Sequence, residues 1–312
     1  MNIIFFGSDD FAGAHLEHLL ESKRKVAACV TQPDRPKGRG MKMLLSQVKE
    51  TALKNNIPVL QPDDLKSPDF IRELEGYNAD LFVVIAYGRF LPPVVLDIPK
   101  IMAVNVHGSL LPQYRGAAPI NWAIMNGDAV TGLTIIKLNP RMDAGEIIST
   151  EKVGIGPDED SVSLRARMIA GGCPLLVRTI ESIRNKQFTL LPQDEGRVTF
   201  APKLTRELGV INWPGQSAAQ IHNLVRGLLP WPAAGTTINH IQVKILKTAV
   251  IPGPNATGRP GEILAIEKQG MTVGTRSGAL LIKEIHPHSS KRMTADEFTR
   301  GYPVKPGDVF GK

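Results

Sequence analysis

The stretch "DLFVVIAYG" (residues 80–88) decides the fold class, because every residue from Leu81 to Ala86 is apolar. An unbroken apolar run is typical of a strand that is covered on both faces, as in a parallel sheet between two layers of helices. A second apolar run, "IMAVNVHG" (101–108), follows a short connection. We therefore expect both runs to be strands of a buried sheet.

Outward from these two runs, short β-branched segments alternate with segments of helical periodicity. Further strands are expected at 2–7, 25–31, 132–138 and 145–153, and helices at about 10–22, 46–55, 118–126 and 160–185. Such alternation predicts an α/β domain with a doubly wound, mainly parallel, Rossmann-like sheet. The turn "GSDDFAG" (7–13) lacks the second glycine of a dinucleotide-binding GxGxxG motif. A nicotinamide-dependent dehydrogenase is therefore disfavoured.

The pattern changes after residue 188. Residues 189–206 contain turn-forming residues without clear periodicity and are expected to form a linker that lies on the first domain. One helical segment, 217–228, then precedes short strands separated by glycine and proline. We expect residues 1–188 to form the α/β domain and residues 207–312 to form a small all-β, OB-like barrel.

The composition, with 42% hydrophobic and 21% charged residues, is typical of a soluble globular protein. No apolar run reaches the ~18 to 20 residues of a membrane helix, and "NIIFFGSDDF" has neither a basic stretch ahead of an apolar region nor a cleavage site, so no signal peptide is expected. A cytoplasmic protein of bacterial type, with no membrane partner, is expected. Cys29 and Cys173 have no metal-ligand spacing, and the two histidines of "HPHSS" lack further ligands, so buried thiols and no metal site are expected.

The net charge of +7 is unevenly distributed along the chain. Residues 1–200 contain 23 Lys+Arg and 23 Asp+Glu, whereas residues 201–312 contain 14 and 7, so the whole excess (14 − 7 = 7) is C-terminal. Lysine and arginine side chains that neutralise phosphates give a protein sequence-independent affinity for nucleic acids. The C-terminal part therefore either binds a polyanion or has a basic surface that only aids solubility.

Two polar residues end the apolar run at 101–108. Asn105 and His107 stand two apart, so in a strand their side chains project from the same face. Ligands of open α/β sheets bind beyond the carboxyl ends of the strands, which is where this pair is expected. Further along, "NPRMDAGEII" places Asp143 at the start of another strand, where an aspartate can also be only a turn residue.

The combination of "NVHGSLLP", "YRG" and "DAG" resembles the active-site signature of the formyltransferase family that uses 10-formyltetrahydrofolate. The resemblance implies that Asn105, His107 and Asp143 are catalytic. These residue types suit the chemistry, because transfer of a formyl group to an amine passes through a tetrahedral oxyanion that needs donors, while a carboxylate beside the imidazole can relay protons. No covalent nucleophile is required.

The same resemblance implies that the folate co-substrate lies against "AYGRFLP" (86–92) and the "SLLP" loop (109–112). A flat pterin needs an apolar slot with main-chain donors and acceptors at its edge. The folate-binding residues expected on this basis are Gly88, Leu91, Ser109, Leu110, Leu111, Pro112 and Met142.

Features outside the signature bear on the acceptor. The basic loop "TQPDRPKGRGMKM" (31–43), the N-terminal "GSDDFA" and the C-terminal "KRMTADEFTRGYPVKPGDVF" resemble the branch of the family that formylates initiator methionyl-tRNA. The resemblance implies this tRNA as partner, and we expect a monomer. The expected tRNA-binding residues are Arg35, Lys37, Arg39, Lys42, Lys244 and Lys247.

Two other functions remain open. The chain could formylate a small amine such as an amino-sugar nucleotide, or it could be a non-catalytic RNA-binding protein. The basic loop, taken alone, is better explained as a solvated charged turn. Trp213 and Trp231 could stack on bases, but tryptophans of small domains are more often part of the core, and we expect both to be buried.

Overall fold

The computed structural model describes residues 1–37, 42–251 and 258–311. The chain forms two compact units. Unit 1 comprises residues 1–119, 130–154 and 165–201, and unit 2 comprises residues 120–129, 155–164 and 202–312. The catalytic domain, linker and C-terminal domain expected from the sequence have bounds that differ from those of the two units. Their division of the chain stays a prediction.

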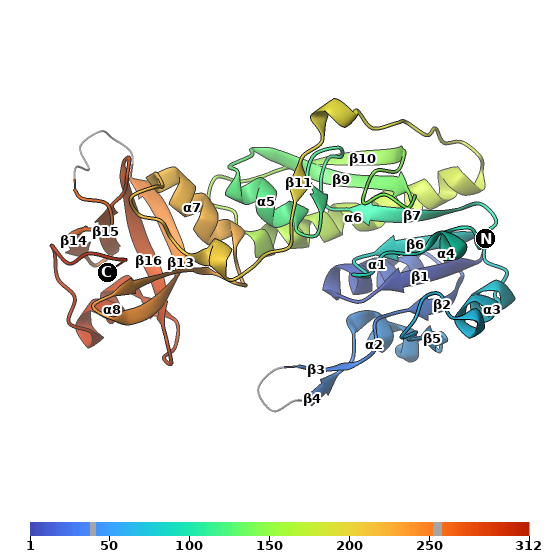
Figure 1. The fold of residues 1–312 in the computed structure, drawn as a ribbon, viewed down its shortest axis with the longest axis horizontal. Coiled ribbons are helices and arrows are strands. Elements are labelled where there is room, and N and C mark those ends of the chain that lie inside the picture. The colour runs from blue at the N-terminus through green and yellow to red at the C-terminus, as the bar shows by residue number, and fades with distance from the viewer. Residues whose placement is uncertain (38–41, 252–257, 312) are drawn as a thin grey trace. The chain divides into compact units, whose positions relative to one another are not determined.

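Unit 1 is built on a seven-stranded sheet with the order β10-β9-β7-β6-β1-β2-β5 (Figure 1). The five strands from β7 to β5 run parallel, and β9 and β10 are antiparallel to their neighbours. The bounds are β1 Ile3–Gly7, β2 Val26–Val30, β5 Val59–Leu60, β6 Leu81–Ile85, β7 Met102–His107, β9 Val130–Lys137 and β10 Ile147–Gly154. The predicted α/β class and mainly parallel sheet are confirmed.

The central strands β1 and β6 are buried along their whole length, as their unbroken apolar sequences require. Helices connect the strands: α1 Asp10–Glu21, α2 Gln47–Lys54, α3 Pro68–Gly76, α4 Pro93–Leu96, α5 Pro119–Met125 and α6 Ser161–Arg184. Asp9, Ser46 and Ser67 cap the first three of these helices, since each side-chain oxygen accepts a backbone N–H of the first turn. The cap residues therefore determine where α1, α2 and α3 begin.

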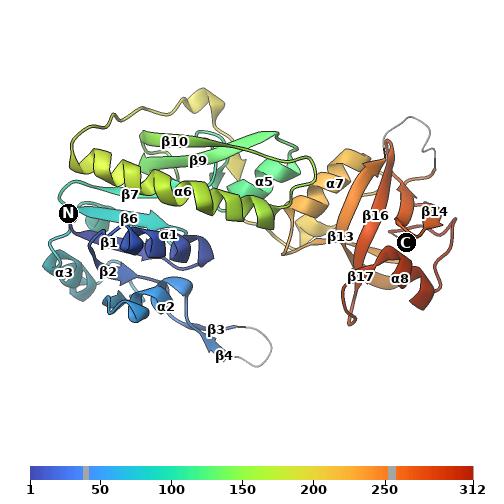
Figure 2. The ribbon, with the colours of Figure 1, turned by 180° about the vertical axis from the view of Figure 1, so that it is seen from behind.

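Helices α1 and α6 lie side by side over one face of this sheet (Figure 2). The Arg165 guanidinium of α6 donates to the carboxylates of Asp9 and Asp10 and lies 5.1 Å from the centre of the Phe11 ring. Both cysteines are buried free thiols, as expected. Burial raises the pKa of the Cys29 thiol to about 12, so Cys29 is unreactive at neutral pH.

Two short strand pairs lie outside the main sheet. The strands β3 (Arg35–Lys37) and β4 (Lys42–Leu44) form an antiparallel pair within the basic segment, which the sequence pattern presented only as a loop. After α6 the chain passes β10 and ends unit 1 at β11 (Phe200–Ala201), which pairs with β8 (Arg115–Gly116) (Figure 1). A 3-10 turn, η1, spans Glu195–Arg197.

Unit 2 contains an antiparallel six-stranded sheet in which β12-β13-β16-β15-β14 follow one path and β17 pairs with β16. Its elements are η2 Glu207–Gly209, α7 Ala218–Gly227, β12 Ala234–Ile238, β13 Ile241–Ile251, β14 Ile263–Glu267, β15 Gly270–Gly274, β16 Ala279–Pro287, β17 Met293–Thr294 and α8 Ala295–Gly301. The predicted all-β fold of the C-terminal part is confirmed, as an antiparallel sheet. In the part of the chain that the structure describes, no pairing joins β12 to β14.

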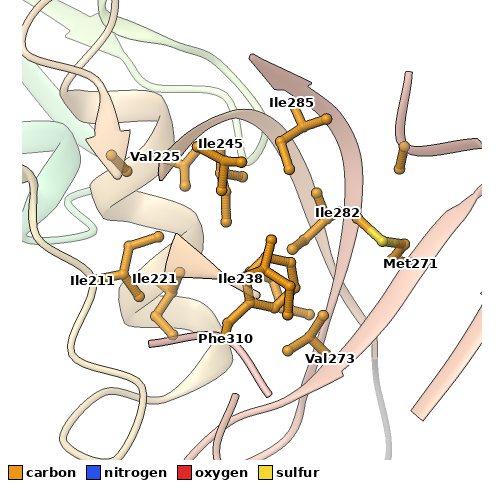
Figure 3. Packing of buried hydrophobic residues seen from close by; sticks show 14 of the residues in the cluster. Ile211, Ile221, Val225, Ile238, Ile245, Met271, Val273, Ile282, Ile285 and Phe310 are labelled. Atoms are coloured by element: carbon orange, nitrogen blue, oxygen red, sulfur yellow. The ribbon is translucent and has the colours of Figure 1, made fainter. Parts of the chain in front are cut away.

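The core of unit 2 is formed mainly by aliphatic side chains of α7 and the sheet, together with Trp213, Phe298 and Phe310. Ile221 and Val225 of α7 face Ile245 and Ile282 of the central strands (Figure 3). Ser217 caps α7 through a capping box with Gln220 and fixes the start of this helix.

The two tryptophans Trp213 and Trp231 differ in burial. Trp213 is 2% exposed, stacks on Phe310 and donates from Nε1 to the hydroxyl of Thr236, as expected of a core residue. The expectation for Trp231 was wrong, because this side chain is 48% exposed. Trp231 lies in the connection between α7 and β12, flanked by Pro230 and Pro232, rather than in an element that packs against the sheet.

Candidate active site

Asn105 and His107 lie at the carboxyl end of β7, beside the end of β6. These strands run parallel, with Asn105 opposite Val84, and Asn105 also faces Ile136 of antiparallel β9. The intervening Val106 is buried on the opposite face. The predicted shared face of Asn105 and His107 thus coincides with the strand-end position where α/β sheets bind ligands.

The imidazole of His107 is 5% exposed and has a neighbour at each nitrogen. Its Nε2 lies 2.9 Å from the carbonyl oxygen of Tyr114, so Nε2 carries the proton and donates this hydrogen bond. Its Nδ1 lies 3.7 Å from Oδ2 of Asp143, which is longer than a hydrogen bond. The structure therefore brings His107 and Asp143 together, with the second ring nitrogen facing the carboxylate.

Asp143 lies in the connection between β9 and β10. Its backbone has a φ of 48°, in the left-handed region that aspartate tolerates better than most residues. The carboxylate oxygen Oδ2 accepts a hydrogen bond of 2.8 Å from the backbone N–H of Gly116. This bond ties Asp143 to the loop that follows β7.

The side-chain amide of Asn105 is half-buried and, among the described residues, forms no hydrogen bond. An amide nitrogen carries two N–H donors. Asn105 can therefore donate to an oxygen of a bound molecule without breaking an existing interaction.

The loop after β7 is held tightly by polar contacts. The hydroxyl of Thr134 on β9 donates to the carbonyl of Ser109 and accepts from the backbone N–H of Leu111. The hydroxyl of Ser109 donates to the carbonyl of Gln113. These bonds fix the backbone of the expected folate loop.

The other expected folate residues differ in exposure. Gly88 is exposed with a φ of 79°, and a Cβ there would lie 2.5 Å from the Gln32 side-chain nitrogen. Met142, next to Asp143, is 41% exposed. Leu91 and Leu111 are buried, Pro112 is half-buried, and Leu110 packs on Gly132 of β9. The exposed Gly88 and Met142 are thus available for contact with a ligand, whereas Leu110 contributes to packing.

The expected tRNA contacts fall in two places. Arg35, Lys37 and Lys42 are on the backbone of β3 and β4, and Arg39 lies outside the described residues. Lys244 and Lys247 are exposed on β13. Among the residues that the structure describes, no cluster of three or more His, Cys, Asp and Glu could hold a metal ion.

Sequence reasoning missed the residues that hold the Asp143 loop and the loop after β7. The guanidinium of Arg115, itself 5% exposed, donates to the side chains of Gln193 and Glu195. The hydrogen bond from Arg115 lowers the pKa of the Glu195 carboxyl below its ordinary value. Gln193 lies in a segment without periodicity, so no pattern in the sequence marks it, whereas the buried Arg115 is part of the quoted "YRG".

Comparison with known families matches both parts of the chain. Residues 1–180 match the formyl transferase family, and residues 203–303 match its C-terminal domain. Methionyl-tRNA formyltransferase of Acetivibrio thermocellus is 44% identical over 312 residues, covering 100% of both chains. The same enzyme of Geobacter metallireducens is 41% identical, covering 100% of this chain and 99% of its own.

Solved structures with the same fold are more distant in sequence. The sugar 3N-formyltransferase WlaRD has a TM-score of 0.68 at 17% identity, with 93% of this chain and 99% of its own covered. HypX from Aquifex aeolicus in complex with tetrahydrofolic acid has a TM-score of 0.65 at 19% identity, with 99% and 50% covered. At these identities the likeness concerns the fold.

Proposed function

The chain belongs to the formyl transferase family, and on that premise we propose that it transfers the formyl group of 10-formyltetrahydrofolate to the amino group of methionyl initiator tRNA. The assignment of the acceptor rests on similarity to methionyl-tRNA formyltransferases over the full length of the chain. This similarity includes the C-terminal part. The observation that supports the chemistry is the approach of Asp143 to His107 beside the free amide of Asn105.

In the proposed reaction the amine nitrogen attacks the formyl carbon, and a tetrahedral adduct with an oxyanion forms. Asn105 donates its free N–H to this oxygen. Protonation of His107 places a second N–H at Nδ1, on the side of Asp143, while Nε2 keeps its bond to the carbonyl of Tyr114. Donors already in place stabilise such an oxyanion more strongly than water, because they need no reorganisation.

The proton balance assigns the role of Asp143. The amine loses a proton as its bond to carbon forms, and N10 of the folate gains one as the carbon–N10 bond breaks. A carboxylate that borders both groups can accept the first proton and return it, directly or through water. Asp143 is suited to this relay because its Oδ2 is anchored by Gly116 N–H.

The folate is proposed to lie against Gly88, Leu91 and the 109–112 loop, beside Met142. Both strand-end loops supply main-chain donors and acceptors for a pterin edge. We assign catalysis to residues 1–188, connection to residues 189–206 and general tRNA binding to residues 207–312. The basic excess of residues 201–312 supports the last assignment.

We further propose that the protein acts as a monomer in a bacterial-type cytoplasm, where initiator tRNA is found. Across residues 1–37, 42–251 and 258–311, no helix is long and apolar enough to cross a membrane. Size-exclusion chromatography with light scattering measures the oligomeric state directly.

A single assay tests the acceptor. The protein is mixed with 10-formyltetrahydrofolate and, in separate reactions, with methionyl initiator tRNA, uncharged initiator tRNA and a dTDP-amino sugar. We expect formylated product only from the charged tRNA, since only this acceptor combines a free amine with the phosphates of an RNA. Formylation of the amino sugar alone would establish the small-amine alternative, and RNA binding without product would establish the non-catalytic one.

A further inference from the structure

The segment of residues 191–201, which we call the strap, contacts the loop that carries Asp143 and the loop that follows Asn105 and His107. Leu191 exchanges backbone hydrogen bonds of 2.8 and 2.9 Å with Ile147 at the start of β10. Toward its other end, Thr199 accepts the N–H of Tyr114 through its hydroxyl and the N–H of Arg115 through its carbonyl, both at 2.9 Å. The strap thus joins the Asp143 loop to the loop after β7.

Gln193 makes the central connection of the strap. Its Nε2 donates to the carbonyl oxygens of Asp143 and Gly145, each at 2.7 Å. Its Oε1 accepts from Nε and Nη2 of Arg115, at 3.1 and 2.8 Å. One amide therefore uses its donors on the Asp143 loop and its acceptor on the other loop.

Both loops that the strap joins contain residues with a positive φ. Asp143 has a φ of 48°, Tyr114 has 61°, and Gly116 has 127°. Left-handed backbone at a residue other than glycine costs roughly 1 kcal/mol or more and persists only where surrounding contacts impose it. The contacts that impose it here include those of the strap.

We propose that Gln193 is a positioning residue for the transfer reaction, fixing the carboxylate of Asp143 relative to His107. This inference rests on the proposed function. Gly116 N–H holds the Asp143 side chain, whereas Gln193 holds the Asp143 main chain, so the two bonds together define the 3.7 Å separation from Nδ1. Without Gln193 two carbonyl groups lose their donors, and the loop is free to shift.

The first test is the kinetics of Gln193→Ala. A displacement of ~1 Å at a reacting group can reduce a rate by about 10²-fold, so kcat should fall by about that factor while KM for the folate stays within about twofold. Gln193→Glu should behave similarly, because it keeps the acceptor for Arg115 but loses the donor. The matched control is Gln187→Ala, an exposed glutamine whose side chain forms no hydrogen bond among the described residues.

A double-mutant cycle separates positioning from general stability. If Gln193 acts through Asp143, adding Gln193→Ala to Asp143→Asn should lower the residual rate by less than about threefold. Multiplication of the two single effects, or a normal kcat in Gln193→Ala, would overturn the proposal.

A measurement without turnover makes the inference independent of the acceptor. The ring signals of His107 in the NMR spectrum, at one fixed pH, should move in Gln193→Ala and stay in place in Gln187→Ala, since the ring senses the nearby carboxylate. Unmoved signals together with a folded Gln193→Ala would also contradict the proposal. Absence of formylation by the wild-type protein with moved signals would instead contradict only the proposed function.

Discussion

At the scale of single residues, the polar side chains of the candidate site differ in whether they already form hydrogen bonds within the protein. His107 and Asp143 are each tied to the backbone of the loop after β7, through Tyr114 and Gly116. The amide of Asn105, by contrast, has no partner among the described residues. The amide of Asn105 is not among the buried polar atoms without a partner, so it reaches solvent and can exchange water for an oxygen of a bound molecule.

Asn105→Ala should therefore lower kcat by about 10² or more without loss of folding, which is the scale of removing one oxyanion donor. Asn105→Asp, of the same shape but with no N–H, should be at least as slow. Steady-state formylation rates and a thermal unfolding curve measure both quantities. Asn185→Ala, at an exposed position after α6, is the control, and near-normal turnover of Asn105→Ala would remove this residue from the reaction.

A second buried histidine has a structural role. His15 of α1 is fully buried, its Nδ1–H donates to the carbonyl of Phe11 at 2.7 Å, and its Nε2 has no partner among the described residues. A Cβ on Gly172 of α6 would lie 2.7 Å from Nε2, so the ring packs directly on that helix. Burial lowers the pKa of His15 from 6.5 to about 4.

This depressed pKa predicts acid destabilisation. Below pH 6.5 the unfolded chain binds a proton at His15 that the folded chain does not. The free energy of unfolding therefore falls as the pH falls from 6.5 to about 4, where the loss is complete. The loss amounts to about 3 kcal/mol. His15→Asn keeps a donor for Phe11 but cannot titrate, and its unfolding free energy should depend less on pH between 6.5 and 4. His18→Asn is the control, and equal pH dependence in wild type and His15→Asn would contradict the assignment.

At the scale of elements, the pairing of β8 with β11 places a glycine where no other residue fits. Gly116 has a φ of 127°, and a Cβ there would lie 2.6 Å from the carbonyl oxygen of Ala201. The same glycine donates its N–H to Asp143. Close approach of the strap and orientation of the carboxylate therefore depend on one backbone conformation.

Gly116→Ala should consequently both destabilise unit 1, by roughly 1–3 kcal/mol, and lower kcat. Denaturant unfolding and formylation kinetics measure the two effects. Gly76→Ala, at the end of α3, is the control, since nothing lies within 4 Å of its Cβ and it should be neutral or slightly stabilising. Full stability and activity in Gly116→Ala would show that the β8–β11 contact is dispensable.

Elements with strong periodicity could be predicted from the sequence, and elements defined by distant contacts could not. The apolar runs that became β6 and β7 are typical of strands in a sheet that is covered on both faces. Once β7 is a strand, the spacing of Asn105 and His107 places both side chains on one face. The strap contains two short elements whose conformation depends on partners about 80 residues away, such as Arg115. The predicted burial of Trp231 was wrong because this side chain lies in the connection between α7 and β12, and no periodic pattern in the sequence indicates its exposure.

At the scale of the whole molecule, the chain crosses between the two units more than once. Residues 120–129 and 155–164 belong to unit 2, although residues on both sides of each segment belong to unit 1. Asn121 donates to the carbonyl of Gly227, and Arg226 donates to the carbonyl of Glu159. Cutting the chain after residue 206 would therefore remove partners from these segments rather than release an intact domain.

The crossing also changes the distribution of charge. Residues 202–312 contain 14 Lys+Arg and 7 Asp+Glu, but Asp128 and the three acidic residues at 158–160 raise the carboxylates of unit 2 to 7 + 4 = 11. The positive potential of unit 2 must therefore be local. One such place is a hollow whose lining includes Lys247, Lys268 and Lys283. Its two carboxylates, at 284 and 296, are already paired with the arginines at 292 and 300.

The last prediction concerns the two lysines of β13, of which Lys247 lines this hollow. Lys244 and Lys247 are exposed, and among the described residues neither forms an ion pair with a carboxylate, so their charge is available to phosphates. Replacing both with glutamine should weaken tRNA binding and reduce its salt dependence by about 0.7 to 0.9 in slope for each phosphate that is no longer neutralised. Because these residues lie on β13 rather than on β7, which carries Asn105, or on the loop that carries Asp143, kcat at saturating tRNA should change little.

The control for this pair is Lys54→Gln with Lys186→Gln, which removes the same two charges from exposed positions of unit 1. A general effect of net charge would lower affinity equally in both double variants, because both remove two charges, and it would be weak because charges act over only ~10 Å in 0.1 M salt. Direct binding of phosphates by these lysines would lower affinity and salt slope only in the β13 variant. Binding isotherms at several salt concentrations distinguish the two cases, and equal slopes in all three proteins would exclude Lys244 and Lys247 from the tRNA interface.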